Sequence, residues 1–109
     1  MSNPIINPSG TKVWLNDQQE LHREDGPAIE DANGDKYWYR DGKFHREDGP
    51  AVELTNGDKL WYRDDKLHRE DGHAVEYADG TKRWFLKGTE IKCKSNEEFL
   101  RLLKVKAFW

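Results

Sequence analysis

The stretch HREDG occurs three times in the chain, beginning at His22, His45 and His68. An imidazole beside two carboxylates could supply a general base and the acid that orients it. Catalysis, however, needs one preorganised cleft with a unique set of groups, and neighbouring residues of an extended segment point to opposite faces. Three near-identical copies therefore predict that the protein is not an enzyme, with no catalytic residue and no cofactor.

The same histidines are poorly placed to share a metal ion. If each unit contributes two strands, equivalent residues of successive units lie about 10 Å apart, twice the spacing of neighbouring strands. Ligand nitrogens around zinc sit about 2.1 Å from the metal. A single loop offers one histidine with its carboxylates and no third strong ligand, so we expect no metal site.

A structural role accounts for each residue of the motif. The glycines Gly26, Gly49 and Gly72 permit the backbone conformation of a tight connection, and Pro27 and Pro50 fix φ where the next strand begins. Arginine can pair with two carboxylate oxygens at once, and histidine can hydrogen-bond to carbonyls or carboxylates. We therefore expect a structural ladder of charges along the stack, made of His22, Arg23, Asp25, His45, Arg46, Asp48, His68, Arg69 and Asp71.

The motif belongs to a repeat of 23 residues that organises most of the chain. Full units cover residues 21–43, 44–66 and 67–91, and the first two agree at 17 of 23 positions. A partial unit at 9–20 precedes them, in which Gly10 and Trp14 match Gly34 and Trp38, and residues 1–8 form a lead-in. At the other end, Ile91 is expected to take the place of Leu21.

Each unit carries the signals of short strands and tight turns. Asn33-Gly34 and its equivalents lie between a strand-like run and an aromatic run, which predicts a type I′ hairpin turn with two positive φ angles. Asp41-Gly42 suggests a second turn. We expect the aromatic run to be one strand with alternating side chains, and Trp14, Trp38, Trp61 and Trp84 to form a row. The predicted fold is mainly β, a single-domain antiparallel β-meander of hairpin repeats with one C-terminal α-helix.

Residues 92–109 differ in kind. Ser95 is followed three residues later by Glu98, a capping-box pattern, and Phe99 and Leu102 follow at helical spacing. We expect a helix from 96 to about 106 that caps the last repeat, because the end of a repeat stack exposes an open core. The alternative is a helix that docks on a partner, which the apolar ends Phe108 and Trp109 favour.

Composition sets further limits. The net charge is −3, 36% of the residues are charged, and acidic and basic residues are mixed along the chain. No basic face suggests direct nucleic-acid binding. No segment resembles a membrane span or signal peptide, and a single cysteine excludes an internal disulfide, so a cytoplasmic location is expected.

The period, the hairpin units and the pattern G-D-K-x-W-Y-R-D-G-K resemble the MORN repeat, in the variant form of bacterial and phage proteins. The version with L-H-R-E-D-G-P-A is similar to small phage and prophage proteins. The resemblance covers about residues 9–91 and implies a binding scaffold rather than an activity. The third unit departs most, with His73 in place of proline and Arg83 in place of an aromatic residue.

We therefore expect a non-enzymatic protein-binding module. The resemblance implies a phage-encoded inhibitor that blocks a host bacterial protein, such as a CRISPR-type defence effector, in the host cytoplasm. A sponge for a nucleotide signal, an antitoxin and a self-assembling structural protein are the alternatives, and a homo-oligomer is possible. Exposed Trp, Tyr and Arg dominate interfaces, so the candidate partner-binding residues are Trp38, Tyr39, Arg40, Trp61, Tyr62, Arg63, His73, Phe108 and Trp109.

Overall fold

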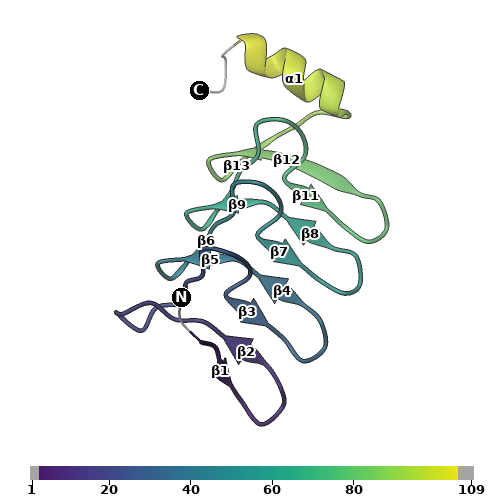
Figure 1. Cartoon of the computed structure of the whole chain (residues 1–109). Helices are drawn as coiled ribbons and strands as arrows, with labels where there is room; N and C mark the ends of the chain where they lie inside the picture. The colour runs from purple at the N-terminus through teal and green to yellow at the C-terminus, as the bar shows by residue number, and fades with distance from the viewer. Residues whose placement is uncertain (1–2, 106–109) are drawn as a thin grey trace.

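The computed structural model describes residues 3–105 as an elongated stack of β-hairpins closed at one end by a helix (Figure 1). Its longest dimension is 48 Å, and the other two are 30 and 18 Å. The prediction of a mainly β antiparallel meander with one C-terminal helix is confirmed. No helix in the described part of the chain is both long and apolar enough to cross a membrane.

The stack is built on a nine-stranded sheet in the order β1-β2-β3-β4-β7-β8-β11-β12-β13, in which every neighbouring pair is antiparallel. Its strands are β1 (Ile5–Ile6), β2 (Lys12–Val13), β3 (Ile29–Glu30), β4 (Lys36–Tyr37), β7 (Val52–Glu53), β8 (Lys59–Leu60), β11 (Val75–Glu76), β12 (Lys82–Leu86) and β13 (Thr89–Ile91). Two separate hairpins complete the units, β5 (Tyr39–Arg40) with β6 (Lys43–Phe44), and β9 (Tyr62–Arg63) with β10 (Lys66–Leu67).

The prediction that each aromatic run forms one strand is wrong for the first two full units. In the first, the run divides at Trp38, with β4 before it in the long sheet and β5 after it in a separate hairpin. The Trp38 amide donates to the carbonyl of Ala51 in the next unit (2.7 Å), whereas the carbonyl of Tyr39 accepts from the amide of Arg23 (3.3 Å). The backbone of the run therefore hydrogen-bonds to the next unit at Trp38 and to the start of its own unit at Tyr39. Each of these units contains two hairpins rather than two strands. Only the last unit keeps the run as one strand, β12.

The type I′ turn was also predicted at the wrong dipeptide. Gly34 has a φ of +102°, but Asn33 is not in the positive region. The amide of Gly34 donates to the Asp31 carbonyl (2.9 Å), which is the pattern of a type I turn followed by a left-handed glycine. Two successive positive φ values occur instead at Asp41 (49°) and Gly42 (81°), where a two-residue loop joins β5 to β6. The same paired values occur at Asp64-Asp65 and at Lys87-Gly88.

The first and last units extend the pattern differently from the prediction. Strand β1 lies inside the expected lead-in and pairs with β2, so the lead-in contributes a strand to the sheet. At the other end Ile91 pairs with Trp84, as the amide of His68 bonds the carbonyl of Trp61. Ile91 therefore stands in the place of the histidines and not in the place of Leu21, because the Lys87-Gly88 turn contains no extra residue.

Helix α1 (Asn96–Val105) lies at the opposite end of the stack from β1 (Figure 1). Its Phe99 is fully buried in a cluster with Trp84, Leu86 and Ile91. Ser95 begins the helix by accepting the amide of Glu98 through its hydroxyl (3.1 Å). The helix thus covers the apolar end of the last unit, as the capping interpretation predicts. Phe108 and Trp109 lie outside the described residues.

Candidate functional site

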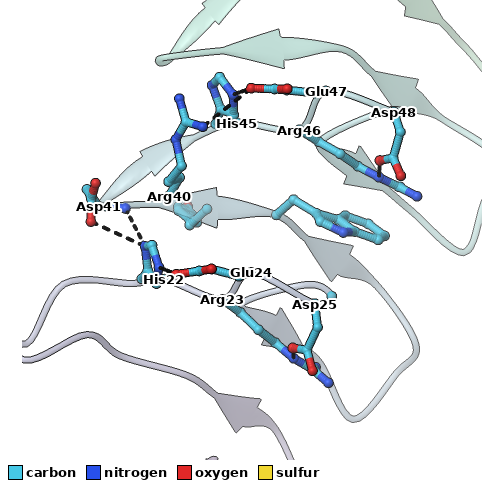
Figure 2. A pocket seen from close by; sticks show the side chains of 13 residues that line it. His22, Arg23, Glu24, Asp25, Arg40, Asp41, His45, Arg46, Glu47 and Asp48 are labelled. Atoms are coloured by element: carbon cyan, nitrogen blue, oxygen red, sulfur yellow. Dashed lines mark hydrogen bonds and ion pairs between the residues drawn. The ribbon is translucent and has the colours of Figure 1, made fainter. Parts of the chain in front are cut away.

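The three HREDG loops follow one another along one edge of the stack, with open grooves between them. The first groove has a volume of about 1010 Å³ and lies between the loops that begin at His22 and His45 (Figure 2). Its wall is completed by residues 38–41. A second groove of about 570 Å³ lies between the loops that begin at His45 and His68. The edge therefore presents the same charged loop repeatedly, with room between the copies for side chains of a partner.

The arginine of each loop stacks on the tryptophan of the preceding unit. The guanidinium carbon of Arg46 lies 3.9 Å from the centre of the Trp38 ring. The equivalent distances are 3.8 Å for Arg23 over Trp14 and 4.2 Å for Arg69 over Trp61. Such a contact combines the attraction of a cation for the ring face with apolar packing. It joins consecutive units.

The position of the arginine side chain explains why the motif contains a glycine, because the guanidinium lies close to the glycine Cα. A Cβ placed on Gly49 would lie 2.9 Å from Cζ of Arg46, and one on Gly26 would lie 3.0 Å from Cζ of Arg23. Neither glycine has a positive φ. Our expectation that these glycines serve a special backbone conformation is therefore wrong. They are small because the arginine passes directly over them.

Hydrogen bonds hold this arginine in a single position. Arg46 donates from Nε to Asp48 (3.1 Å) and from Nη1 to the carbonyl of Pro50 (3.0 Å) and to Glu53 (3.1 Å). Arg23 makes the same three contacts, with Asp25, the Pro27 carbonyl and Glu30. The hydrogen bond from Arg23 is the main cause of a lowered pKa of Asp25. We call this set of contacts, together with the tryptophan, the arginine clamp.

The histidines use both ring nitrogens inside the protein. Nδ1 of His45 accepts the backbone amide of Asp64 (3.1 Å), so its proton must reside on Nε2, which faces Glu47 (3.3 Å). The hydrogen bond from His45 is the main cause of a lowered pKa of Glu47. His22 and His68 repeat this arrangement with the amides of residues 41 and 87 and with Glu24 and Glu70. No lone pair of these rings is left to accept a proton from a substrate in the groove.

The ladder has a covered side and an exposed side. The arginine and histidine side chains of the three loops are 7 to 26% exposed, whereas their glutamate and aspartate side chains are 58 to 88% exposed. The arginines lie against the tryptophans, and the carboxylates are exposed. The outer surface of the three loops is therefore acidic, whereas the grooves between them also contain the exposed cations Arg40 and Arg63.

Most of the aromatic candidates for partner binding are packing residues. The Trp38 and Trp61 rings are covered by arginine. The Tyr39 and Tyr62 rings lie on Phe44, with ring centres 4.4 and 5.0 Å from it. Burial raises the pKa of both tyrosines.

Of the candidates within residues 3–105, the two arginines are the exposed ones, and their ion pairs differ. Arg40 lies 3.4 Å from Glu47 and 3.9 Å from Asp64. Arg63 has Lys87 at the position equivalent to Asp64, and within residues 3–105 no ion pair joins it to a carboxylate. The second groove therefore has one more free cation than the first.

His73 is buried and does not contribute to the exposed surface, contrary to its choice as a partner contact. Its Nε2 lies 2.7 Å from Glu76, and its ring meets Trp61 and Trp84 edge-on at 5.5 and 6.3 Å between ring centres. Its Nδ1 lies 3.4 Å from Oδ1 of Asn96, the oxygen that also accepts the Trp84 indole N–H (2.8 Å). The departure from proline is thus explained by the capping helix. The hydrogen bond from His73 is the main cause of a lowered pKa of Glu76.

Sequence reasoning missed a second feature of the last unit. Arg83 and Glu90 occupy the positions of Tyr37 and Phe44, and they form two hydrogen bonds of 2.9 and 3.0 Å. This pairing lowers the pKa of Glu90 to about 2 and raises that of Arg83. An ion pair therefore replaces an aromatic pair where the stack ends. The sequence offered one sign of this ion pair, because aromatic residues are replaced by oppositely charged residues at both positions.

Among the described residues, no group of three or more His, Cys, Asp or Glu side chains is arranged to hold a metal ion. Comparison with family models, with curated proteins and with solved structures gave no match. The fold and the loop edge together define the class as an open stack of β-hairpin repeats with a helical cap. The resemblance to MORN repeats stays a prediction.

Proposed function

We propose that the protein is a non-enzymatic protein-binding module whose HREDG edge docks on a basic surface of its partner. The observation that carries this proposal is the division of charge across the loops, in which the cations are held inward and the carboxylates outward at each repeat. A surface with regularly placed carboxylates is complementary to lysine and arginine side chains, which favours association with a basic partner.

The contacts within the loops support a binding role because they order the carboxylates before a partner arrives. Asp48 is held by Nε of Arg46, and Glu47 is held by His45 and Arg40. Side chains that are ordered in the free protein lose less conformational entropy on binding. The geometry thus favours recognition by a rigid edge over recognition by a flexible loop.

The class of partner follows from this charge and from the resemblance to phage proteins. We propose a phage-encoded inhibitor that covers a basic surface of a host bacterial protein, such as a CRISPR-type defence effector, in the bacterial cytoplasm. RNA-guided effectors hold nucleic acid in a positively charged channel. An acidic edge that occupies such a channel would prevent nucleic acid from entering it.

Two other functions receive less support from the same contacts. A histidine acting as general base would need a free lone pair, and Nδ1 of each loop histidine already accepts a backbone amide. A nucleotide sponge would need an aromatic face on which a base can stack, and arginines cover the tryptophans of the three loops. An antitoxin would use the same kind of surface as an inhibitor, and the identity of the captured partner separates these two.

The proposal is tested by affinity capture from bacterial lysate with two matched variants. Glu47→Gln combined with Glu70→Gln removes two negative charges from the loop edge, and Asp17→Asn combined with Glu97→Gln removes two exposed charges elsewhere. We expect the wild-type chain and the second variant to retain the same basic protein in stoichiometric amount, and the first variant to lose it. Equal capture by both variants, or no stoichiometric partner, would contradict the proposal. Heat on titration with cyclic dinucleotides would favour the sponge.

A further inference from the structure

The end of the stack opposite the helix is an open sheet edge. Strand β1 pairs with β2 on one side, and within the described residues no strand pairs with its other side. Its two side chains, Ile5 and Ile6, are each 59% exposed. They form the one pair of adjacent large apolar side chains that is exposed in residues 3–105.

The later units show how far the residue equivalent to Ile5 is buried inside the stack. Ile5 pairs with Val13, as Val52 pairs with Leu60 and Val75 with Arg83 in the later units. Val52 and Val75 are only 4% and 1% exposed, and each has a strand of the preceding unit on its other side. Ile29, which has β2 on its other side, is half-buried. Ile5 therefore occupies a position that the later units cover, partly at Ile29 and almost completely at Val52 and Val75.

The second position differs in residue type from the other units. Ile6 stands where they carry Glu30, Glu53 and Glu76, each of which is bound by an arginine or a histidine. In addition, residues 3–11 contain no charged side chain, although 36% of the whole chain is charged. Natural sheet edges are commonly protected by charges that prevent pairing. At this edge an apolar residue, Ile6, stands where the other units have a glutamate.

We propose that β1 pairs with β1 of a second copy of the chain, in antiparallel orientation about a two-fold axis. Every pairing in the nine-stranded sheet is antiparallel, and a two-fold axis relates two identical strands in that orientation. The uncharged segment lets two copies of a chain with net charge −3 approach without local repulsion. Helix α1 covers the other end of the stack, so the assembly closes at two copies instead of growing into a fibre.

The size of the end limits the strength of this dimer. The two shorter dimensions of the molecule are 30 and 18 Å, and the end of the stack is no larger than that cross-section. Specific stable interfaces bury about 800 Å² on each partner, more than this end offers. The dimer is therefore expected to be weak and to form only at high protein concentration. It aligns two acidic edges in one particle and is independent of the proposed function of that edge.

Sedimentation equilibrium of the full chain over a range of concentrations tests the dimer. We expect the average mass to rise from the monomer value of 12.8 kDa toward twice that value. Ile6→Glu installs the residue of the other units, so it keeps the fold and is expected to leave a monomer at all concentrations. Leu100→Glu, the matched change on the exposed face of α1, is expected to dimerise as the wild type does.

Far-ultraviolet circular dichroism and the urea midpoint establish that both variants are folded. A wild-type chain that stays monomeric would overturn the proposal, as would an Ile6→Glu variant that still dimerises. Loss of the dimer in Leu100→Glu alone would place the interface on the helix and would equally overturn it.

Discussion

Replacing Arg46 with alanine tests whether the arginine clamp joins the repeat units. The side chain is 22% exposed, stacks on Trp38 and donates to Asp48, Glu53 and the Pro50 carbonyl. A partly covered cation on an aromatic ring contributes about 1 kcal/mol. Hydrogen bonds to charged groups contribute about 1.5 to 3 kcal/mol, a value reduced here because the Asp48 carboxylate is exposed and that of Glu53 is half-buried. We expect Arg46→Ala to lower the free energy of unfolding by about 2 to 3 kcal/mol.

Two further variants separate the clamp from the charge. Arg46→Lys keeps the positive charge but cannot make three directed hydrogen bonds while stacking flat on the ring, so we expect a loss of about 1 to 2 kcal/mol. Arg40→Ala removes an exposed arginine of the neighbouring hairpin, whose ion-pair distances are 3.4 and 3.9 Å. Such exposed pairs are worth about 0 to 1 kcal/mol, and Arg40→Ala should lie in that range.

Urea unfolding, followed by tryptophan fluorescence and by circular dichroism, measures these differences. Coincident transitions by the two methods would establish two-state behaviour, which the comparison of free energies requires. The reasoning is refuted if Arg46→Ala costs no more than Arg40→Ala, or if Arg46→Lys is as stable as the wild type. Either result would mean that the guanidinium contacts do not join the units.

Three further predictions concern other parts of the molecule. Gly49→Ala should destabilise the protein by about 1 to 2 kcal/mol because its Cβ would lie 2.9 Å from the clamped guanidinium, whereas Gly72→Ala, with its nearest contact at 3.5 Å, should be near neutral in the same urea assay. Asn96→Ala should cost about 1 to 3 kcal/mol because the buried indole N–H of Trp84 loses its acceptor, and Asn96→Asp, which keeps an oxygen there, should cost less. Because the folded-state pKa of Glu90 is lowered from 4.5 to about 2, its contribution to stability is present above about pH 4.5 and is lost as the pH falls toward 2. Glu90→Gln should therefore make the free energy of unfolding less dependent on pH in that window; an unchanged slope would contradict this.

The architecture was predictable because the same local sequence signals occur in each repeat unit. The 23-residue period, the turn dipeptides and the capping pattern from Ser95 to Glu98 each specify local structure, and together they predicted hairpins and a capping helix. The class of turn was not predictable from Asn33-Gly34, since this pair suits both a type I′ turn and a type I turn followed by a left-handed glycine. Here only Gly34 takes the positive φ.

The features that were missed depend on contacts between units. The aromatic run divides into two strands at Trp38, whose amide bonds the carbonyl of Ala51 in the next unit. Gly49 is required by the path of the Arg46 side chain. His73 is explained by Asn96, which lies 23 residues further along the chain. No local pattern contains these partners, so their geometry follows only once the stack is assembled.

The central claim is that an acidic edge associates with a basic partner, and the association rate constant tests it most directly. Purified captured partner and wild-type chain would be mixed in a stopped-flow instrument at about 50 mM and about 200 mM salt, conditions that change the screening length between exposed charges. We expect the rate constant to fall several-fold at the higher salt concentration, and the Glu47→Gln, Glu70→Gln variant to associate more slowly and with less dependence on salt. A rate constant that is independent of salt and unaffected by removal of these two carboxylates would contradict the claim.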